Sequence, residues 1–379
     1  MRTYDVIVLG VGGMGSAALY HLARRGARTL GIEQFGIAHD RGSSHGGTRI
    51  CRKAYFEHPD YVPLLHRAYE LWDELEAAAG RELFRRAGLL LAGPADGQII
   101  PGVRRSAVEH GLDIQEVGVA ELARRFPALA VDPGMCVLFE PDAGYLRVED
   151  CVRAHVEQAL RSGARIMGDT HVQHWSADDK GVVVNTNDGQ YAAAALVICG
   201  GAWSSRLLAG LGLPLEVRRK VLVWLVDFDD ECRVERGCPV FAMESGGGFY
   251  YGFPAIDEQG MKIGQHFGGE TVRDPDELDG VLRPEDEQPL LGFVARHLPR
   301  ARPTIGHRAV CMYTMTPDEH FIIDRHRDHS RVVFAAGFSG HGFKFAPVLG
   351  SILADLALDG RTQEPIAFLR ASRPALQPR

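Results

Sequence analysis

The sequence predicts an α/β protein, α+β overall, in which a Rossmann-like domain is joined to a second, smaller domain built on a mixed or antiparallel sheet. Residues 4–9 are a short apolar run, as expected of a buried parallel strand, and a glycine turn and a helical pattern follow it. The same order of strand, glycine turn and helix returns near the other end of the chain. Strand patterns dominate much of the sequence between them, and 379 residues are enough for two domains.

The first forty residues carry the pattern of a dinucleotide-binding unit. Gly10, Gly12 and Gly15 form G-x-G-x-x-G directly after the first strand. In such a unit the first glycine permits the tight turn, the second lets the backbone approach a pyrophosphate, and the third lets helix and strand pack closely. The start of the helix adds free N–H groups for phosphates. The alternative is a glycine-rich turn in an α/β fold that binds nothing.

An acidic residue, Glu33, closes the second strand, which we expect at residues 29–32. A carboxylate at this position accepts hydrogen bonds from the adenosine ribose and repels a 2′-phosphate. NADP is therefore disfavoured, whereas FAD and NAD both remain open from these residues.

Composition and charge argue against several classes of protein. The chain carries a formal net charge of −7 and has no basic run, which argues against nucleic-acid and membrane partners. No apolar stretch is long enough to span a membrane, and because the first strand begins almost at Met1 we expect no signal peptide. The seven cysteines are odd in number and lack the paired spacing of metal ligands, so a reduced, cytoplasmic protein without a metal site is expected.

The segment after Glu33 begins with a loop, because residues 43–47 are rich in glycine and small polar residues. Arg49 and Arg52 follow this loop closely. Two loop arginines usually form surface salt bridges, but these lie just after a phosphate-binding turn, so contact with a ligand is an equally good interpretation. Residues 60–79 have the periodicity of an amphipathic helix.

The pattern changes at residue 84, where we expect part of the second domain to be inserted into the first. The elements predicted there are a strand at 87–92, a helix at 97–110, a short helical turn at 121–126 and a strand at 135–140. The larger part of the second domain is expected to follow later, with strands at 217–228, 238–243, 248–253 and 261–267 and a polar helical stretch at 274–297.

Between these two parts the chain returns to the first domain. A helix is predicted at 149–162, and residues 164–198 suggest three strands, two of them joined near Asn187-Asp188-Gly189, a strong hairpin signal. The apolar run Leu196–Cys199 then leads into the glycines at 200–201. This is either a second close approach to a cofactor or a plain turn between a strand and a helix.

The C-terminal part completes the first domain. Strands are predicted at 308–314, 321–324 and 332–336, and the last of them leads into a glycine turn and the final helix. The predicted division of the chain is 1–83, 145–214 and 310–379 for the first domain, and 84–144 and 215–309 for the second.

Six motifs together resemble one family, the monomeric sarcosine oxidases and N-methyltryptophan oxidases, within the FAD-dependent amine oxidoreductases of the D-amino-acid-oxidase-like group. The motifs span nearly the whole chain, and the last two are too specific for chance agreement. They are GVGGMG at 10–15, SSHGGTRICRKAY at 43–55, YYGFP at 250–254, KIGQH at 262–266, CMYTMTPDEHFIIDRH at 311–326 and GFSGHGFKF at 337–345.

The resemblance implies a cofactor and a reaction. It implies FAD rather than NAD, and oxidation of a secondary amine by oxygen. The substrate it implies is an N-methyl amino acid, either sarcosine or a bulkier one such as N-methyltryptophan, and the products are the amino acid, formaldehyde and hydrogen peroxide. It further implies a monomer whose partners are a small-molecule substrate and oxygen.

The resemblance also assigns a covalent link to the flavin at Cys311. From the residues alone, a cysteine in an apolar run such as that around Cys311 is more often a small core thiol. If it is the family's flavin-linked cysteine, its thiolate must form next to positive charge. The residues expected to bind the cofactor are Gly10, Gly12, Gly13, Met14, Gly15, Glu33, Ser43, His45, Thr48, Arg49, Val172, Gly200, Trp203, Cys311, Gly340, Gly342, Phe343 and Lys344.

Four residues resemble the family's catalytic groups. Arg49 matches the cation that lies over the flavin ring, and Lys262 matches the lysine on the other face that promotes the reaction with oxygen. A fixed cation has this effect because the first electron transferred to oxygen produces an anion. His266 and Tyr313 match groups on the substrate side, although histidine and tyrosine are also common core residues. Lys262 could otherwise be a solvated strand lysine.

Arg52 and Lys344 resemble the pair that holds the substrate carboxylate, because a guanidinium and an ammonium together can fix an amino acid's orientation. Lys344 is predicted in the first turn of the final helix, where a cation opposes the helix dipole, so a ligand role explains it better than a structural one. The start of that helix, at residues 340–343, is expected to point its N–H groups at the flavin.

The walls of the substrate site depart from the sarcosine-specific pattern. Tyr251 matches a tyrosine of the pocket wall, but Ala242 stands where those members, as aligned, carry a larger methionine. Gln265 replaces an aromatic residue beside His266. A smaller wall leaves room for a bulkier N-methyl amino acid.

Other functions are weaker interpretations. A nicotinamide dehydrogenase leaves Cys311 and the SGHGFKF turn unexplained, and a non-catalytic binding protein needs no array of cations. A flavin dehydrogenase that passes electrons to a protein or quinone is a stronger alternative, although Lys262 argues against it. An oxidase of cyclic or sugar-modified secondary amines lies closest to the main hypothesis.

Overall fold

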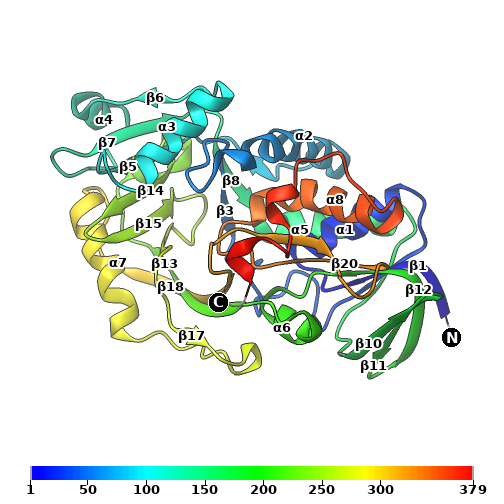
Figure 1. Ribbon diagram of the computed structural model, residues 1–379. Helices are drawn as coiled ribbons and strands as arrows, with labels where there is room; N and C mark the ends of the chain where they lie inside the picture. Colours follow the sequence, from blue (N-terminus) through cyan, green and yellow to red (C-terminus); the bar gives the residue numbers. More distant parts are fainter. Residues whose placement is uncertain (1, 378–379) are drawn as a thin grey trace.

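The computed structural model describes residues 2–377 of the chain and builds them around two large sheets (Figure 1). The first sheet has a parallel centre in which β1 lies between β12 and β2. Val6, Ile7 and Val8 of β1 are fully buried, as expected of a strand covered on both faces. The strands of this sheet are β1 (Arg2–Leu9), β2 (Thr29–Ile32), β9 (Arg165–Met167), β10 (Val172–Asp178), β11 (Gly181–Thr186), β12 (Gly189–Ile198), β19 (Ile322–Arg325) and β20 (Val332–Ala336).

Strand β12 joins two halves of this sheet. Its first residues pair antiparallel with β11, whereas Leu196–Ile198 pair parallel with β20. The other edge of β12 carries β1 along its whole length. The carboxyl ends of β1, β12 and β20 therefore lie at the same edge of the sheet, where the glycine turns follow them.

Four helices cover one face of the first sheet and enclose its largest apolar core (Figure 1). Helix α1 is buried from Gly13 to Ala23 because α5 and α8 pack on either side of it. Its contact with α8 is close: a Cβ at Gly350 would lie 2.5 Å from the carbonyl carbon of Ala17. The helices are α1 (Gly13–Arg24), α2 (Val62–Ala79), α5 (Val148–Arg161) and α8 (Ala346–Leu358).

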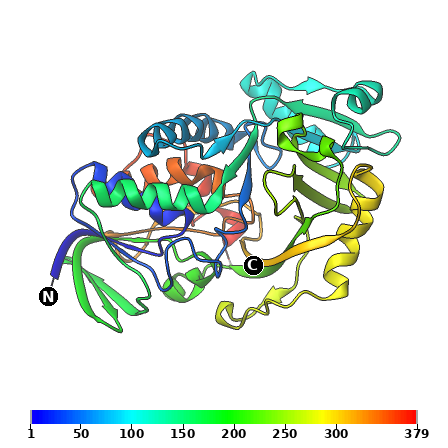
Figure 2. The same ribbon diagram turned by 180° about the vertical axis from the view of Figure 1, so that it is seen from behind.

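The second sheet is mixed, because all its pairs are antiparallel except the parallel pair of β14 and β5. Helix α7 lies on its outer side, away from the first sheet (Figures 1 and 2). The strands are β5 (Leu89–Gly93), β6 (Gln115–Glu116), β7 (Cys136–Glu140), β13 (Glu216–Leu225), β14 (Val240–Ser245), β15 (Gly248–Phe253), β16 (Met261–Gln265), β17 (Thr271–Val272) and β18 (Ile305–Met315). The helices of this part are α3 (Ile99–His110), α4 (Val119–Arg125) and α7 (Pro284–His297).

A small third sheet and a short helix complete the regular structure. The sheet consists of β3 (Thr48–Cys51), β8 (Gly144–Arg147) and β4 (Phe84–Arg85), and the short helix is α6 (Ser204–Leu207). The predicted α/β fold, with a Rossmann-like part and a second part on a mixed sheet, is confirmed. The domain boundaries stay a prediction; the one at residue 310 falls inside β18, a strand of the second sheet.

Two predicted elements were wrong. Residues 164–198 form four strands rather than three, because β10 and β11 are joined by a turn that Asp178 closes by accepting from the N–H groups of Lys180 and Gly181. The predicted helical stretch 274–297 is an α-helix only from Pro284 onward. The residues before it run irregularly, because Pro284 lacks an N–H and has its favoured place at a helix start.

Candidate active site

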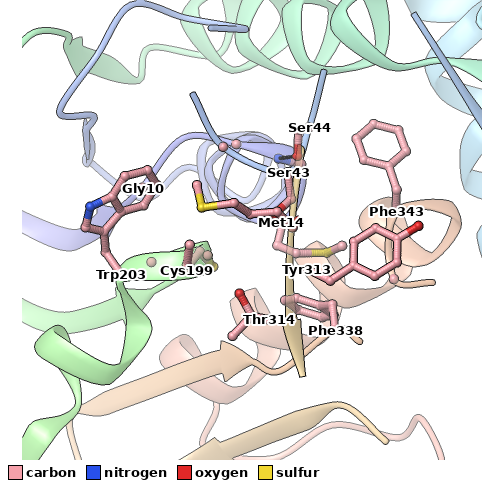
Figure 3. Close-up of a pocket in the computed structure, with 18 of the residues that line it drawn as sticks. Gly10, Met14, Ser43, Ser44, Cys199, Trp203, Tyr313, Thr314, Phe338 and Phe343 are labelled. Carbon is pink, nitrogen blue, oxygen red and sulfur yellow. Dashed lines mark hydrogen bonds between the residues drawn. The ribbon is translucent and has the colours of Figure 1, made fainter. Parts of the chain in front are cut away.

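A cavity of about 580 Å³ is lined by residues of both large sheets. Gly10 and Trp203 lie at one side of it, and Tyr313 and Phe343 lie at the other (Figure 3). The loops that line the first side follow the carboxyl ends of β1, β2 and β12, which is where open α/β sheets bind ligands.

The three fingerprint glycines differ in what surrounds them. Gly10 has φ = +82°, and a Cβ there would lie 2.4 Å from the carbonyl oxygen of Cys199. A Cβ at Gly15 would lie 1.8 Å from the carbonyl oxygen of Gly10, so that helix and strand could not pack. Gly12 is different: the nearest atom to its Cβ position is Ser44 Oγ at 3.7 Å, and the residue lines the cavity. No atom of the described residues therefore crowds the backbone of Gly12, where a pyrophosphate would approach it.

Glu33 is 5% exposed and lines the cavity at the end of β2. Its Oε2 accepts from the N–H of Val11 at 2.7 Å, and its Oε1 accepts from the N–H of Phe35 at 3.2 Å. These bonds fix the carboxylate beside the glycine turn while each oxygen keeps a further lone pair for a ligand hydroxyl.

The second sheet presents one face to the cavity. Because side chains alternate along a strand, every second residue of β13, β14, β15, β16 and β18 lies on this face, and most of their neighbours pack on α7. Met312 and Thr314, at the end of β18, are exceptions and line the cavity as well. The residues on this face include Cys311 and Tyr313 of β18, Lys220 and Leu222 of β13, Lys262 and Gly264 of β16, Phe249, Tyr251 and Phe253 of β15, and Ala242 of β14.

This alternation corrects one expectation about the walls. Gln265 was expected to widen the substrate site, but it pairs with Tyr250 and lies on the face toward α7. It is not among the cavity-lining residues, whereas Ala242 is. Only the substitution at Ala242 therefore bears on the size of the cavity.

Arg49 lines the cavity and is held by backbone carbonyls. Its Nη1 donates to the carbonyl of Thr48 and its Nη2 to the carbonyl of Ser43, both at 2.8 Å. The same Nη2 lies 3.5 Å from Cys311 Sγ. The guanidinium is thus oriented by the loop at 43–48 and lies against the thiol.

Cys311 is 1% exposed, but its environment favours the thiolate. Burial alone would raise the pKa of its thiol; the hydrogen bond from His45 and the positive charges of Arg49 and Lys262 outweigh this, and the pKa falls to about 7. The other cysteines with shifted values, such as Cys51 and Cys199, have their pKa raised to about 12 by burial. Among the described cysteines, Cys311 has the surroundings of a reactive thiol.

Lys262 is 2% exposed and directly adjoins the same loop. Its Nζ donates to the carbonyls of Gly46 and Thr48 at 2.7 Å and to Thr48 Oγ1 at 3.1 Å. Burial, and then the charge of Arg49, lower the pKa of Lys262 well below its ordinary value. Its amino group is buried behind the lining residues, so Lys262 is not a solvated strand lysine.

Arg52 and Lys344 both line the cavity and are both buried. Arg52 is not free, because its Nη2 lies 2.7 Å from both carboxylate oxygens of Glu57, and its Nη1 donates to the carbonyl of Ala54 at 2.8 Å. Lys344 Nζ donates to the carbonyl of His341 at 2.6 Å. Burial, and then the charge of Arg52, lower the pKa of Lys344 to about 7.

The predicted place of Lys344 in the final helix was wrong. It lies in a 3₁₀ turn, η7 (Phe343–Phe345), and α8 begins only at Ala346. The turn is formed because Gly340, with φ = +82°, redirects the chain; a Cβ there would lie 2.2 Å from the ring of Tyr313. Gly340, Gly342 and Phe343 line the cavity as predicted, but from this turn.

His266, Tyr251 and Tyr313 line the cavity as neutral groups. Burial, followed by the charges of His341 and Lys220, lowers the pKa of His266 to about 3. Burial, followed by Tyr251, raises the pKa of Tyr313 well above its ordinary value, and burial raises that of Tyr251 as well. Among these three side chains, none carries a charge near neutral pH.

Five of the predicted residues do not line the cavity. They lie behind those that do, and they are Gly15, His45, Thr48, Lys262 and Cys311. Four residues were missed by sequence reasoning: Glu57, Phe249 and His341 line the cavity, and Lys220 adjoins it with its Nζ donating to the carbonyls of His266 and Gly268. Two of them had a signal in the sequence: His341 lies inside the motif at 337–345, and Glu57 lies two residues after the motif at 43–55.

The lining residues fit FAD. The glycine turn and Glu33 provide for an adenosine diphosphate, and the buried cations and Cys311 lie at the other end, where the isoalloxazine ring would be held. One polar atom of the cavity lacks a partner: within residues 2–377, nothing bonds the buried Oγ1 of Thr314. Such an atom in a cavity wall is expected to bond a ligand.

The described part of the chain lacks two further features, a helix able to cross a membrane and a cluster able to hold a metal ion. None of its helices is both long and apolar enough to cross a membrane. Within residues 2–377, no group of three or more His, Cys, Asp or Glu side chains is arranged to hold a metal ion.

The chain was compared with known proteins. The model of the FAD-dependent oxidoreductase family DAO matches residues 5–356. The chain is 43% identical to the monomeric sarcosine oxidase of Streptomyces avermitilis, with 99% of both chains covered, and 41% identical to that of Bacillus sp. strain B-0618, with 99% of this chain and 97% of that one covered. It is 37% identical to the N-methyl-L-tryptophan oxidase of Salmonella enteritidis, over 98% of this chain and 99% of the relative.

Among solved structures, the amino acid oxidase NikD has the same fold, with a TM-score of 0.86, 24% identity and 98% of both chains covered. Glycine oxidase from Geobacillus kaustophilus also shares the fold, with a TM-score of 0.81 and 22% identity over 98% of this chain and 99% of that one. The full-length matches at 37–43% identity and the family model over residues 5–356 agree. The chain therefore belongs to the DAO family of FAD-dependent oxidoreductases, in the group of the monomeric sarcosine oxidases and N-methyltryptophan oxidases.

Proposed function

We propose that this protein is an FAD-dependent oxidase that removes the methyl group of an N-methyl amino acid, giving the amino acid, formaldehyde and hydrogen peroxide. The observation that carries the proposal is the pair Arg52 and Lys344 in the wall of a cavity that is also lined by the aromatic side chains of Phe249, Tyr251 and Tyr313. Two cations suit a carboxylate, and the aromatic face suits the rest of a small amino acid. The names of the full-length relatives support the same reaction.

When bound, FAD accepts two electrons from the substrate and passes them to oxygen. The glycines of the 10–15 turn and Glu33 are proposed to hold its adenosine diphosphate, with Gly200 and Trp203 beside them. Arg49 and the turn at 340–344 are proposed to hold the ring. Cys311, with its pKa of about 7 and Arg49 Nη2 at 3.5 Å, is proposed as the site of covalent attachment.

The substrate carboxylate is proposed to bind between Arg52 and Lys344. Lys344 has a pKa of about 7. Binding of the carboxylate should raise this pKa and favour the ammonium form, because an opposite charge nearby favours the charged form. Arg52 must share its guanidinium between the substrate and Glu57, or leave Glu57. The carboxylate thereby fixes the orientation of the N-methyl group.

The amine is proposed to react in its neutral form. His266, Tyr251 and Tyr313 are neutral around it, and the positive charges of Arg49 and Lys262 disfavour a third cation. No dedicated carboxylate base is therefore required. The same two cations stabilise the anion that forms when oxygen takes up its first electron.

The remaining properties are expectations of the same proposal. All seven cysteines are free in the structure, which supports a reduced, cytoplasmic protein. We propose that it acts as a monomer on a small-molecule substrate and oxygen, without nucleic-acid or membrane partners, and that its domains divide at the boundaries predicted from the sequence.

The first test is the absorption spectrum of the purified protein before and after acid precipitation. We expect yellow colour to stay in the pellet, and to pass into the supernatant from a Cys311→Ser variant. A Cys51→Ser variant is the matched control, because Cys51 is equally buried but has a raised pKa. Colour in the supernatant of the unaltered protein would rule out the covalent link, and a colourless protein would contradict the flavoenzyme assignment.

The second test measures the reaction. We expect peroxide and formaldehyde in equal amounts from sarcosine, N-methyltryptophan or another N-methyl amino acid. Turnover with an artificial electron acceptor but without peroxide would indicate a dehydrogenase. Peroxide only from a cyclic or a sugar-modified amine would keep the oxidase but replace the substrate class.

A further inference from the structure

We propose that Tyr55 is a positioning residue that holds Arg52 and Lys344 together as one carboxylate-binding unit. Tyr55 closes the motif at 43–55, is fully buried, and does not itself line the cavity. The proposal rests on the carboxylate-binding role proposed above for the two cations.

Both cations lie over the ring of this tyrosine. The guanidinium carbon of Arg52 is 4.3 Å from the centroid of the Tyr55 ring, and Lys344 Nζ is 5.0 Å from it. Two like charges this close together repel, and the charge of Arg52 does lower the pKa of Lys344. The face of an aromatic ring carries negative potential and attracts both. The ring therefore reduces the cost of keeping two buried cations beside one another.

The ring is itself fixed by a chain of hydrogen bonds. His341 Nε2 lies 3.0 Å from the carbonyl of Glu319, which can only accept, so this nitrogen carries the proton. Nδ1 of His341 is then the acceptor for the Tyr55 hydroxyl. The carbonyl of His341 also accepts from Lys344 Nζ at 2.6 Å. His341 thus connects the tyrosine hydroxyl to the lysine that lies over the tyrosine ring.

The backbone of Tyr55 is anchored as well. Its carbonyl accepts from Ser106 Oγ of helix α3 at 2.5 Å, and its ring meets that of Phe345 edge to face at 5.3 Å. Phe345 follows Lys344 in η7. Tyr55 is therefore in contact with the loop that carries Arg52, with the turn that carries Lys344, and with the second part of the molecule.

The neighbouring Tyr61 provides a matched control. It is also fully buried, and its ring centroid lies 5.0 Å from that of Tyr55. Its hydroxyl is bonded in a similar way, to His320 Nδ1 and to the N–H of Phe321. Among residues 2–377, however, no lysine or arginine lies over the Tyr61 ring. Removing it perturbs the same aromatic core without touching the two cations.

The experiment compares Tyr55→Phe, Tyr55→Leu and Tyr61→Leu in the flavin-loaded enzyme. We measure kcat and KM for the N-methyl amino acid and for its methyl ester, in which the carboxylate charge is masked. Tyr55→Phe keeps the ring and should leave KM for the acid within about threefold. Tyr55→Leu should raise that KM about tenfold or more, with kcat little changed, and leave KM for the ester unaltered. Tyr61→Leu should leave both KM values unaltered.

A graded series keeps the proposal testable if the leucine variant does not fold. Phenylalanines with one, two and three ring fluorines at position 55 keep the shape of the ring and progressively weaken its negative face. KM for the acid should rise with each fluorine. A flat series overturns the proposal, as does an equal rise for the ester, or a rise in the Tyr61→Leu variant as large as that in Tyr55→Leu.

Failure of the underlying function is distinguishable. Lys344→Met should raise KM for the acid and not for the ester. If it leaves KM for the acid unchanged, the carboxylate role of Lys344 is wrong and the proposal for Tyr55 falls with it. If Lys344→Met has its effect and the fluorinated series is flat, only the role of Tyr55 is wrong.

Discussion

The ion pair of Arg52 and Glu57 is buried, which costs folding free energy, and it lies in the wall of the cavity. Both side chains are under 10% exposed, and burying two charges costs several kcal/mol that their attraction only partly returns. A core built for stability alone would replace such a pair by apolar residues. Its presence in the cavity wall agrees with the role proposed for Arg52, in which the substrate carboxylate would compete with Glu57 for the same guanidinium.

At the same scale, the size of residue 242 should decide which substrate fits. Ala242 is 2% exposed, lines the cavity and lies directly opposite Tyr251 in the sheet. An Ala242→Met variant should lower kcat/KM for N-methyltryptophan at least about tenfold, because the longer side chain fills the space for the indole. Sarcosine, which has no side chain, serves as the internal control and should change by less than about threefold. Equal losses for both substrates would contradict this role.

At the scale of elements, the turn from β1 into α1 contains glycines with two roles: one is needed for packing, and another is proposed to approach the ligand. Gly15→Ala should destabilise the protein, because its Cβ would lie 1.8 Å from the Gly10 carbonyl oxygen. Gly12→Ala meets no protein atom closer than 3.7 Å, so it should fold normally but bind FAD more weakly. Thermal unfolding of the flavin-free proteins and the flavin bound per chain check this.

Two outcomes would argue against this separation of roles. One is a Gly12→Ala variant whose flavin-free form is as unstable as that of Gly15→Ala. The other is a Gly12→Ala variant with a full complement of flavin, which would show that the backbone of this turn does not approach the pyrophosphate.

The elements also show how far sequence reasoning reaches. The first strand, its glycine turn, α1 and the acid at Glu33 were predicted because each depends on neighbours in sequence. The strand alternation places Lys262 and Tyr313 on the cavity face, and applied to β16 it would have removed Gln265 from the substrate site. The irregular run before Pro284 was missed, because it is held by Arg219, which is distant in sequence and donates to the carbonyls of Asp279 and Val281 and to the carboxylate of Asp286.

Part of the candidate site depends on tertiary contacts and had little or no signal in the sequence. Tyr55 meets Lys344 only because β3 and η7 are brought together across the fold, and Lys220 adjoins the cavity because β13 pairs with β18. The fold class, the family and FAD were predicted from motifs and are confirmed. The roles of the individual site residues, and the covalent link at Cys311, stay predictions.

At the scale of the whole molecule, buried histidines should weaken stability in acid, and two of them lie among the helices of the first sheet. His155 of α5 and His21 of α1 are 1% and 8% exposed, and burial lowers their pKa values to about 3 and about 4. In the unfolded chain both have a pKa of about 6.5, so the unfolded state binds more protons below that pH. Their contribution to stability is therefore full above pH 6.5 and is lost as the pH falls toward 4.

The size of this effect can be measured at pH 7.5 and pH 5. For His155 alone the loss of unfolding free energy between these values is about 2 kcal/mol. A His155→Leu variant should lack that part of the difference in urea denaturation, because leucine has no proton to bind. His307→Leu, which alters an exposed histidine, is the control and should keep the full difference. An unchanged pH dependence in His155→Leu would exclude this source of acid sensitivity.

The packing of α8 on α1 bears on the synthesis of the protein. The nucleotide-binding turn leaves the ribosome about 330 residues before the turn at Gly340–Lys344 and the helix that covers α1. At about 5–20 residues per second, tens of seconds separate the two. During that time the apolar side of α1 lacks its cover, so the nascent chain needs protection by chaperones. Flavin can be fully enclosed only after the turn at Gly340–Lys344 has been synthesised.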